Sequence, residues 1–480
     1  MKVSISYPPL EGEGTPLLSQ NRQFQFFSSP TYIYPMVPAS AATLLHNSGY
    51  KVVWDDGIAE EVTYSKWFTR LRHASPDFIM LETKTPVVKQ HWKIINEIKQ
   101  ALPETKTILV GDHVTALTVE SFQNSRVDFV LTGGDYDFLL LNLVDYLEGK
   151  TKKLDEGIFF REKGKVKNSG KFRLHHDLNS LPFIDRELTK WELYSVKNGN
   201  YKCTPGTYTM VGRDCWYHRC TFCSWPTLYP VFRTRIPSSL LNEISLLVEN
   251  YGVKEIMDDT GCFPIGLWLE KFCNSMVEKE LNRVVSLDCN MRFGALSFEQ
   301  YKLMKNAGFR LLLFGLESAN QKTLHRINKS LKVEQIVDSC KKAKQAGLEP
   351  HITIMFGYPW ENKEEACRTL ELGKLLLKKG FAETVQATVV IPYPGTPLFD
   401  ECKKKDWLKT TNWSRYDMKE PVMKTPMKDE EVMGLVQEIY KVGFDPEFIL
   451  RKVISIRSPS DLKFMARAVG KVMGHIRDFK

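Results

Sequence analysis

Short apolar segments alternate with longer amphipathic segments over the first 150 residues, and this alternation limits the possible folds more than any other feature. Apolar runs of four or five residues are typical of buried strands, whereas apolar positions spaced three or four residues apart are typical of helices. The order predicts an α/β domain with a doubly wound parallel sheet over residues 1–150. The predicted strands are Lys2–Ser6, Lys51–Trp54, Asp77–Leu81, Thr107–Val110 and Asp128–Leu131, and the predicted helices are Val37–Ser48, Val88–Ala101, Thr115–Phe122 and Phe138–Leu147.

Ligands of such sheets bind beyond the carboxyl ends of the strands. Tyr7 follows the first predicted strand, Gly111-Asp112-His113 follows the fourth, and Thr132-Gly133-Gly134 follows the fifth. Small residues at several strand ends suit a flat or extended ligand. Ordinary turn chemistry explains the same residues about equally well.

A second alternation runs from about Tyr208 to Tyr393 and contains six strand–helix units. It predicts a partial (β/α)6 barrel over residues 196–400, in which function concentrates in the loops after strands. Residues 151–195 are predicted to form a hairpin around Asn168–Gly170 and a linker at Leu178–Arg186, and residues 401–480 a helical region. The predicted barrel strands are Tyr208–Gly212, Glu255–Met257, Val284–Leu287, Leu311–Phe314, His351–Phe356 and Val385–Ile391.

The composition narrows the classes of protein. With 480 residues, two or three domains are expected, and ten cysteines are too sparse for a disulfide scaffold. The net charge of +9 is too modest to indicate nucleic-acid binding by itself. No signal peptide or membrane-spanning segment is visible, so we expect a soluble, cytoplasmic protein.

Three of the ten cysteines, Cys215, Cys220 and Cys223, fall within nine residues directly after the first barrel strand. Three thiolates are one ligand short of a closed zinc site, but they suit an iron–sulfur cubane that leaves one iron open. The alternatives are zinc with a fourth ligand such as His218, and buried thiols without a metal. Core packing is the simpler interpretation of the other seven: Cys203, Cys262, Cys273, Cys289, Cys340, Cys367 and Cys402.

The cysteine segment resembles the signature of the radical S-adenosylmethionine (SAM) enzymes, C-x3-C-x2-C with an aromatic residue before the last cysteine. Phe222 supplies the aromatic residue, although four residues rather than three separate Cys215 from Cys220. The resemblance implies that a 4Fe-4S cluster binds to these three cysteines and that SAM is a second cofactor. Motifs after the next three strands resemble the same family in order, and they imply SAM-binding roles for Asp258, Asp259, Asn290, Arg292, Glu317 and Ser318.

The first alternation is similar in order and size to the Rossmann-like cobalamin-binding domains found in one branch of this family. Gly111-Asp112-His113 with Thr115-Ala116-Leu117 resembles their G-G-P-H-x-T-A-L segment, with substitutions. No histidine has an aspartate two positions before it, so the D-x-H-x-x-G motif is absent and we expect no histidine lower ligand from that motif. His113 is interpreted as a pocket or core residue. The resemblance implies that cobalamin contacts Tyr7, Gly111, His113, Thr115, Gly133 and Gly134.

Most characterised members of that branch methylate carbon that is not nucleophilic. One SAM methylates reduced cobalamin, and a second is cleaved to a 5′-deoxyadenosyl radical that removes hydrogen from the substrate before methyl transfer. We therefore predict a cobalamin-dependent radical SAM methyltransferase. The alternatives are a rearrangement, ring contraction or cyclisation without methyl transfer, for which a lipid head group is one candidate substrate, and a non-enzymatic binding module with a structural metal site.

Residues 451–480 contain eight Lys or Arg and two Asp, so most of the net charge lies in this tail. Apolar positions from Leu462 to Ile476 follow helical spacing. A basic amphipathic helix of this kind can lie on an anionic membrane, but packing against the barrel is the preferred interpretation. The expected partners are a small or lipid-like substrate and an external electron donor of the flavodoxin or ferredoxin type, without nucleic acid.

Overall fold

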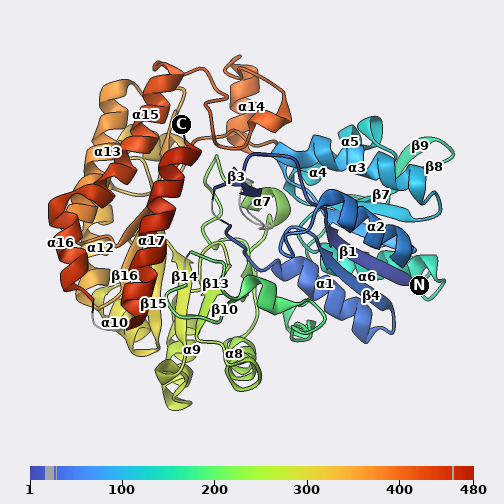
Figure 1. The fold of residues 1–480 in the computed structure, drawn as a ribbon, viewed down its shortest axis with the longest axis horizontal. Coiled ribbons are helices and arrows are strands. Elements are labelled where there is room, and N and C mark those ends of the chain that lie inside the picture. Colours follow the sequence, from blue (N-terminus) through green and yellow to red (C-terminus); the bar gives the residue numbers. More distant parts are fainter. Residues whose placement is uncertain (17–25, 29, 200, 457–458, 480) are drawn as a thin grey trace.

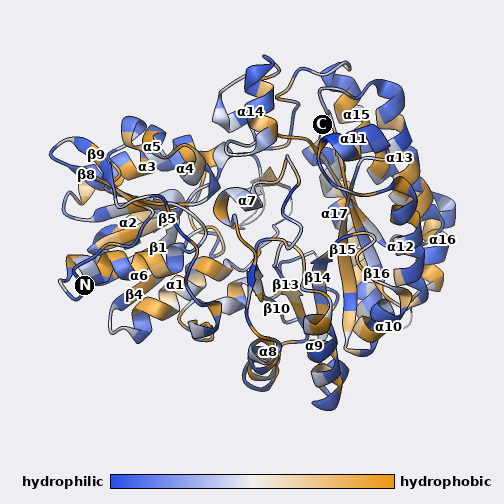
Figure 2. Ribbon diagram, turned by 180° about the vertical axis from the view of Figure 1, so that it is seen from behind, coloured by the Kyte–Doolittle hydropathy of each residue, from blue (hydrophilic) through white to orange (hydrophobic). Residues whose placement is uncertain are grey.

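The computed structural model describes residues 1–16, 26–28, 30–199, 201–456 and 459–479, and it contains two large sheets (Figure 1). We call the part built on the seven-stranded sheet the first lobe and the part built on the six-stranded sheet the second lobe. The strands are mainly hydrophobic, and the helices around them carry hydrophilic residues on their outer faces (Figure 2). Each sheet is therefore covered by helices, and the buried hydrophobic residues of the two lobes form one continuous cluster.

The sheet of the first lobe has the order β4-β1-β5-β6-β7-β8-β9. Its first five strands are parallel, and β8 and β9 form an antiparallel hairpin at the edge. The order reverses between β1 and β5, which is where ligands of doubly wound sheets bind. The strands are β1 (Lys2–Tyr7), β4 (Lys51–Asp56), β5 (Phe78–Glu82), β6 (Lys106–Val110), β7 (Phe129–Leu131), β8 (Ile158–Glu162) and β9 (Lys165–Asn168); the short strands β2 (Thr15–Pro16) and β3 (Phe26–Phe27) pair separately.

The predicted elements of the first lobe are mostly present, with three corrections. The predicted helix Thr115–Phe122 is broken at Leu117 into two helices, and a helix at Tyr64–Ala74 was not predicted. The hairpin turns at Lys163-Gly164, where both residues have positive φ, and not around Asn168–Gly170. The helices are α1 (Met36–Asn47), α2 (Tyr64–Ala74), α3 (Val88–Ala101), α4 (Asp112–Ala116), α5 (Thr118–Asn124) and α6 (Tyr136–Leu147).

The sheet of the second lobe is parallel throughout, with its strands in chain order, as expected for a partial barrel. The strands are β10 (Gly206–Thr209), β13 (Glu255–Asp258), β14 (Ser286–Met291), β15 (Phe309–Glu317), β16 (Glu349–Phe356) and β17 (Thr384–Val389). The helices among and after them are α7 (Trp225–Leu228), α8 (Pro237–Tyr251), α9 (Leu267–Glu278), α10 (Phe298–Asn306), α11 (Gln321–Arg326), α12 (Val333–Gln345), α13 (Lys363–Lys378) and α14 (Pro397–Lys404).

Several strand ends in the second lobe differ from the prediction by a few residues, and two of these differences have a local cause. The first strand stops at Thr209, and Gly212-Arg213 forms the separate strand β11, which pairs with β12 (Arg233–Thr234). The strand predicted from Val284 starts at Ser286 because a short 3-10 helix, Leu281–Arg283, precedes it. Ser297 and Gln300 form a capping box at the start of α10.

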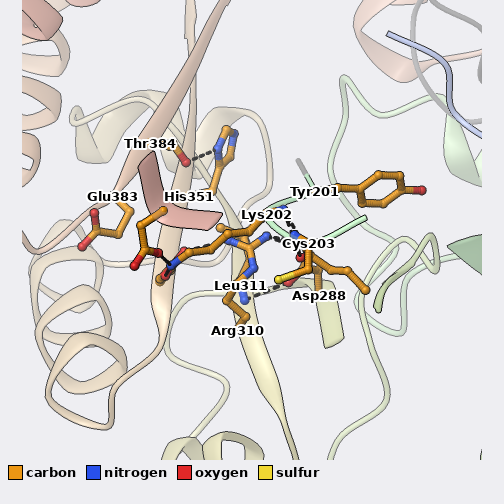
Figure 3. A network of polar contacts seen from close by, with 12 residues as sticks. Tyr201, Lys202, Cys203, Asp288, Arg310, Leu311, His351, Glu383 and Thr384 are labelled. Carbon is orange, nitrogen blue, oxygen red and sulfur yellow. Dashed lines mark hydrogen bonds and ion pairs between the residues drawn. The ribbon is translucent and has the colours of Figure 1, made fainter. Parts of the chain in front are cut away.

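The amino ends of the barrel strands hold a buried ionic network (Figure 3). Arg310 of β15 contacts Glu255 at 2.7 Å, Asp288 at 2.8 Å and Glu349 at 2.7 Å. Glu255 also accepts hydrogen bonds from the backbone of Lys202 and Cys203. This network ties four strands together on the side of the barrel opposite to the loops that follow the strands.

The region after β17 is helical, with α15 (Asp429–Tyr440), α16 (Pro446–Ile454) and α17 (Pro459–Asp478). Helix α17 lies along the second lobe, and its contacts continue into the first lobe (Figure 1). Asp461 is 2.8 Å from Lys202, Arg467 donates to the carbonyl of Tyr201 at 3.1 Å, and Lys471 donates to Thr31 at 2.9 Å. Two of the basic residues in the tail are therefore directed at protein oxygens. No helix among the described residues is long and apolar enough to cross a membrane.

Candidate active site

The three clustered cysteines lie in the loop that follows β11, Asp214–Ser224, which we call the Cys loop. Two side chains from the end of β13 hold the backbone directly before this loop in place. Asp258 accepts hydrogen bonds from Thr209 Oγ1 (2.8 Å) and Val211 N (3.0 Å), and Thr260 Oγ1 accepts one from Gly212 N (2.8 Å). The loop thus starts from a rigid base at the carboxyl ends of the barrel strands.

The residues Cys215, Cys220 and Cys223 are all partly exposed. The pKa of Cys215 is lowered to about 6, chiefly because the Cys262 thiol donates a hydrogen bond to its sulfur. Burial alone would raise this pKa, but the N–H groups of His218 and Tyr217 also donate to the sulfur and lower it. Burial raises the pKa of Cys220 and Cys223. Charge on Cys215 and Cys220 raises the pKa of Cys223 further, so the three sulfurs lie close enough to interact.

Within the described ranges, no three His, Cys, Asp or Glu side chains surround a point that could hold a single metal ion. His218 pairs instead with Asp214, with 2.9 Å between Nδ1 and Oδ2, which disfavours the zinc alternative. Each thiol of a cubane binds a different iron, so a cluster does not need the thiols to converge on one point. Three thiols on one anchored loop fit a cluster with one open iron.

The two aspartates at the end of β13 are both buried. The Asp258 carboxylate is occupied with Thr209, Val211 and Thr260, and burial raises its pKa. Its hydrogen bonds therefore make it a support of the Cys loop. Asp259 is held through its backbone, whose N–H donates to Thr209 O at 2.8 Å.

Asn290 and Arg292 at the end of β14 both contact neighbouring loops. The Asn290 amide donates to Thr260 O at 2.8 Å. The Arg292 guanidinium lies 3.6 Å from the ring centre of Tyr217 in the Cys loop and donates to Ser330 O at 2.9 Å. Arg292 thus connects the Cys loop to the segment after α11 by a cation–π contact.

The end of β15 carries a buried ion pair next to the Cys loop. Glu317 has a positive φ of 63°, which is uncommon for a residue other than glycine, and its Oε1 is 2.7 Å from Lys329 Nζ. Burial alone would lower the pKa of Lys329, but Glu317 and Cys220 raise it, so the lysine stays charged beside the cysteines. Gly315 leaves room for the pair, because a Cβ there would lie 2.1 Å from Glu317 Oε1.

Ser318 belongs to a different hydrogen-bond network. Its side chain is fully buried and donates to Glu361 Oε1 at 2.7 Å, while Asn320 N donates to the Ser318 hydroxyl at 3.0 Å. Ser318 thus holds the turn after Glu317.

The strand ends of the first lobe bring together four of the residues predicted for cobalamin. Thr115 Oγ1 donates to Gly111 O at 2.7 Å and accepts from Gly133 N at 3.1 Å. Gly134 N donates to Leu228 O at 2.9 Å, and a Cβ on Gly134 would lie 1.8 Å from the Tyr229 ring. These glycines therefore allow a close approach between the first lobe and the segment that follows the Cys loop.

Tyr7 and His113 are buried as well and have partners of their own. Tyr7 donates to Glu82 Oε2 at 2.7 Å, at the point where the strand order reverses. His113 is fully buried, with Nδ1 3.2 Å from Thr85 Oγ1 and its ring centre 5.4 Å from that of Trp413. These contacts favour a core role for His113.

The sequence analysis missed a group of ion pairs between the two lobes, which we call the ionic seam. It consists of Arg213, Arg233 and His176 around Asp135 and Asp137. Arg213, directly before the Cys loop, is 2.7 Å from Asp135 and also pairs with Asp137. Arg233 is 2.6 Å and His176 3.1 Å from the same Asp135. Burial raises the pKa of Asp135, but Arg213, His176 and Arg233 together lower it well below its usual range. Asp135 follows Gly133-Gly134, and that position was the only signal in the sequence.

Comparisons with known proteins agree with this site. Residues 210–373 match the model of the radical SAM superfamily. Residues 210–373 therefore form a radical SAM domain, and the prediction made from the Cys loop is confirmed.

Several relatives are named for related reactions. An uncharacterized methyltransferase of Pyrococcus horikoshii is 26% identical over 390 residues, which cover 80% of this chain and 82% of that protein. An anaerobic magnesium-protoporphyrin IX monomethyl ester cyclase of Cereibacter sphaeroides is 23% identical over 379 residues, which cover 77% of this chain but 60% of the cyclase.

Two solved structures share the fold. OxsB, a cobalamin-dependent SAM radical enzyme solved with aqua-cobalamin and SAM, superposes with a TM-score of 0.70 at 15% identity and covers 99% of this chain and 71% of OxsB. The radical SAM methyltransferase TsrM of Kitasatospora setae, solved with cobalamin and a [4Fe-4S] cluster, gives 0.66 at 14% identity and covers 85% of this chain and 79% of TsrM. The two-lobed α/β fold of this chain is thus shared with OxsB and TsrM.

Proposed function

We propose that this chain is a cobalamin-dependent radical SAM methyltransferase that acts on an unactivated carbon of a small molecule. One observation carries the proposal: the segment that directly follows the Cys loop meets the glycines at the strand ends of the first lobe, where Gly134 N donates to Leu228 O at 2.9 Å. A cofactor at each sheet would then face the other across one seam. The similarity to an uncharacterized methyltransferase and to TsrM supports methyl transfer.

In this proposal Cys215, Cys220 and Cys223 hold the cluster. Asp259, Asn290, Arg292 and Glu317 are the candidates for SAM, with Asp258 and Ser318 supporting them through the hydrogen bonds described above. When bound, the cluster supplies the electron that cleaves SAM, and cobalamin carries the methyl group. The proposed backbone surface for cobalamin is formed by Gly111, Thr115, Gly133 and Gly134. Tyr7 and His113 support this surface through their contacts with Glu82 and Thr85. A flavodoxin- or ferredoxin-type protein is the proposed electron donor.

Anaerobic reconstitution with iron, sulfide and hydroxocobalamin tests this function. We expect iron–sulfur absorbance, retained cobalamin, and formation of both 5′-deoxyadenosine and S-adenosylhomocysteine when SAM, reductant and a cell extract containing the substrate are added. The mass of the product identifies the substrate. A parent protein that binds no iron, or a Cys220→Ala variant with unchanged iron content, would falsify the proposal.

The cyclase relative favours a second candidate, a radical ring closure without methyl transfer. Both reactions consume SAM by radical cleavage, so 5′-deoxyadenosine alone does not separate them. S-adenosylhomocysteine together with a product 14 mass units heavier than its substrate (roughly one CH2 group) indicates methylation. A product formed without S-adenosylhomocysteine indicates cyclisation or another rearrangement.

A further inference from the structure

A fourth cysteine lies beside the Cys loop, although the sequence analysis assigned it to core packing. Cys262 follows β13 and forms an isolated parallel bridge with Cys215, the first residue of the cysteine motif. Its side chain is buried, with 3% of its surface exposed. The two cysteines are therefore neighbours across a backbone pairing, 47 residues apart in sequence.

The segment that carries Cys262 is fixed on both sides. Phe263 N donates to Asn290 O at 2.9 Å, and Phe263 O accepts from the Trp216 indole at 3.2 Å. Gly261 packs on the backbone of Asp214 and Cys215, where a Cβ would lie 3.2 Å from both. These contacts hold the backbone on both sides of Cys262 in place beside Cys215.

The chemistry of the pair is asymmetric. The Cys215 sulfur accepts hydrogen bonds from the Cys262 thiol and from the N–H groups of His218 and Tyr217. A cysteine that ligates iron does so as a thiolate, whose sulfur only accepts hydrogen bonds, so the neighbouring Cys262 thiol is the group that can donate. Cys262 is thus a donor, and Cys215 is an acceptor that bears the charge.

We infer that Cys262 is a positioning residue of the iron–sulfur centre, whose S–H donates to the Cys215 sulfur and sets the reduction potential of the bound cluster. The inference rests on the proposed function, because it requires a cluster on Cys215. Hydrogen bonds to ligating sulfurs stabilise the more negative, reduced cluster and so raise its potential. Removal of this donor lowers the potential, so that a given reductant reduces a smaller fraction of the clusters.

The test compares the reconstituted full chain with Cys262→Ala and Cys262→Ser. Cys273→Ala is the matched control, because Cys273 is a fully buried thiol on α9. Iron and sulfide content are measured first, and the midpoint potential is then obtained by redox titration followed by electron paramagnetic resonance. We expect equal iron in all four proteins, a more negative potential only in Cys262→Ala, and a potential near that of the parent in Cys262→Ser, whose hydroxyl keeps a donor.

Full iron with the same potential in Cys262→Ala and in the parent overturns this inference alone. Loss of iron in both Cys262 variants makes Cys262 a ligand and overturns its role as a donor. A parent chain that binds no iron overturns the proposed function, and this inference with it. If Cys262→Ala does not fold, Cys262→Val takes its place, because valine fills the site without a donor: a more negative potential than that of the parent is expected, and an unchanged potential is contrary to the inference.

Discussion

Arg213 and Asp135 form a buried ion pair between the two lobes, with 2.7 Å between Nη1 and Oδ1. Arg213 stands immediately before the Cys loop, and Asp135 immediately follows the glycines of the first lobe. The pair thus fixes the distance between the two surfaces that are proposed to hold the cofactors.

Arg213→Met leaves Asp135 and Asp137 buried without their main cation. We expect the free energy of unfolding to fall by about 3–5 kcal/mol, the usual effect of breaking a buried pair on one side. Urea denaturation followed by circular dichroism measures the change. Lys167→Met removes an exposed cation that pairs with Glu162 and is expected to cost about 0–1 kcal/mol. Equal effects of the two substitutions are the result that contradicts a structural role for the seam.

Glu383 makes the attachment of α16 sensitive to acid. Burial raises the pKa of Glu383, but Lys452 on α16 and Lys344 on α12 lower it from 4.5 to about 2. Because the folded-state pKa is depressed, this stabilisation is complete above pH 4.5 and is lost as the pH falls toward 2. Glu383→Gln is expected to cost about 3 kcal/mol at pH 7, with the difference from the parent shrinking to nothing near pH 2. Urea midpoints of both proteins across this range provide the test, and a constant difference contradicts it.

Gly315→Ala places a methyl group against the Glu317–Lys329 pair, 2.1 Å from one side chain and 2.6 Å from the other. Since the pair must separate, we expect the affinity for SAM to fall by at least about tenfold, or 1.4 kcal/mol, while iron content stays the same. Equilibrium dialysis with labelled SAM measures this affinity. Gly434→Ala, in α15 with open space at the Cβ position, is the control. Unchanged affinity in Gly315→Ala means that the pair does not contribute to the SAM site.

Gly134→Ala drives a Cβ into the Tyr229 ring, 1.8 Å from Cε1. Either the ring or the first lobe must shift, so retention of cobalamin after gel filtration should drop more than fivefold, with destabilisation of about 1–3 kcal/mol from overpacking. Absorbance of the eluted protein reports retention. Gly470→Ala, where a Cβ meets open space in α17, should retain as much cobalamin as the parent. A Gly134→Ala variant that retains cobalamin fully shows that this seam does not shape the cobalamin surface.

Helix α17 is expected to act on stability and not on membrane binding, because Arg467 and Lys471 donate to protein oxygens. Deletion of residues 459–480 should lower the thermal midpoint by several degrees. Co-sedimentation with phosphatidylserine liposomes should be equally weak with and without the helix. Liposome binding that disappears with the deletion reverses this prediction in favour of a membrane contact.

The sequence analysis predicted the elements whose pattern is local. Helix α3 has the predicted bounds, Val88–Ala101, because apolar residues recur at helical spacing along all of it. The break at Leu117 was not predicted because it depends on distant contacts: Thr115 binds Gly133 of another loop. Helix α2 was missed because it buries little more than Trp67 and Leu71.

The residues of the candidate site also divide into those that a local pattern predicts and those that only distant contacts bring together. Cys215, Cys220 and Cys223 are close in sequence, so their spacing was sufficient to predict them. Cys262 lies 47 residues from Cys215, and the ion pair from Asp135 to Arg213 spans 78 residues. Contacts over such separations depend on how the strands are ordered in the sheets, which one sequence read by pattern does not reveal.

The last helix also returns the chain to its beginning. Ser28 N donates to Asp478 Oδ1 at 2.8 Å, and Lys471 reaches Thr31, so the polypeptide runs from the first lobe through the second and back to the first. This closed path means that a cut in the linker would leave two fragments still held together by the helix. The molecule is thus suited to reassembly from two separately expressed halves, which α17 would hold together. For the same reason, the intact chain should unfold as one cooperative unit.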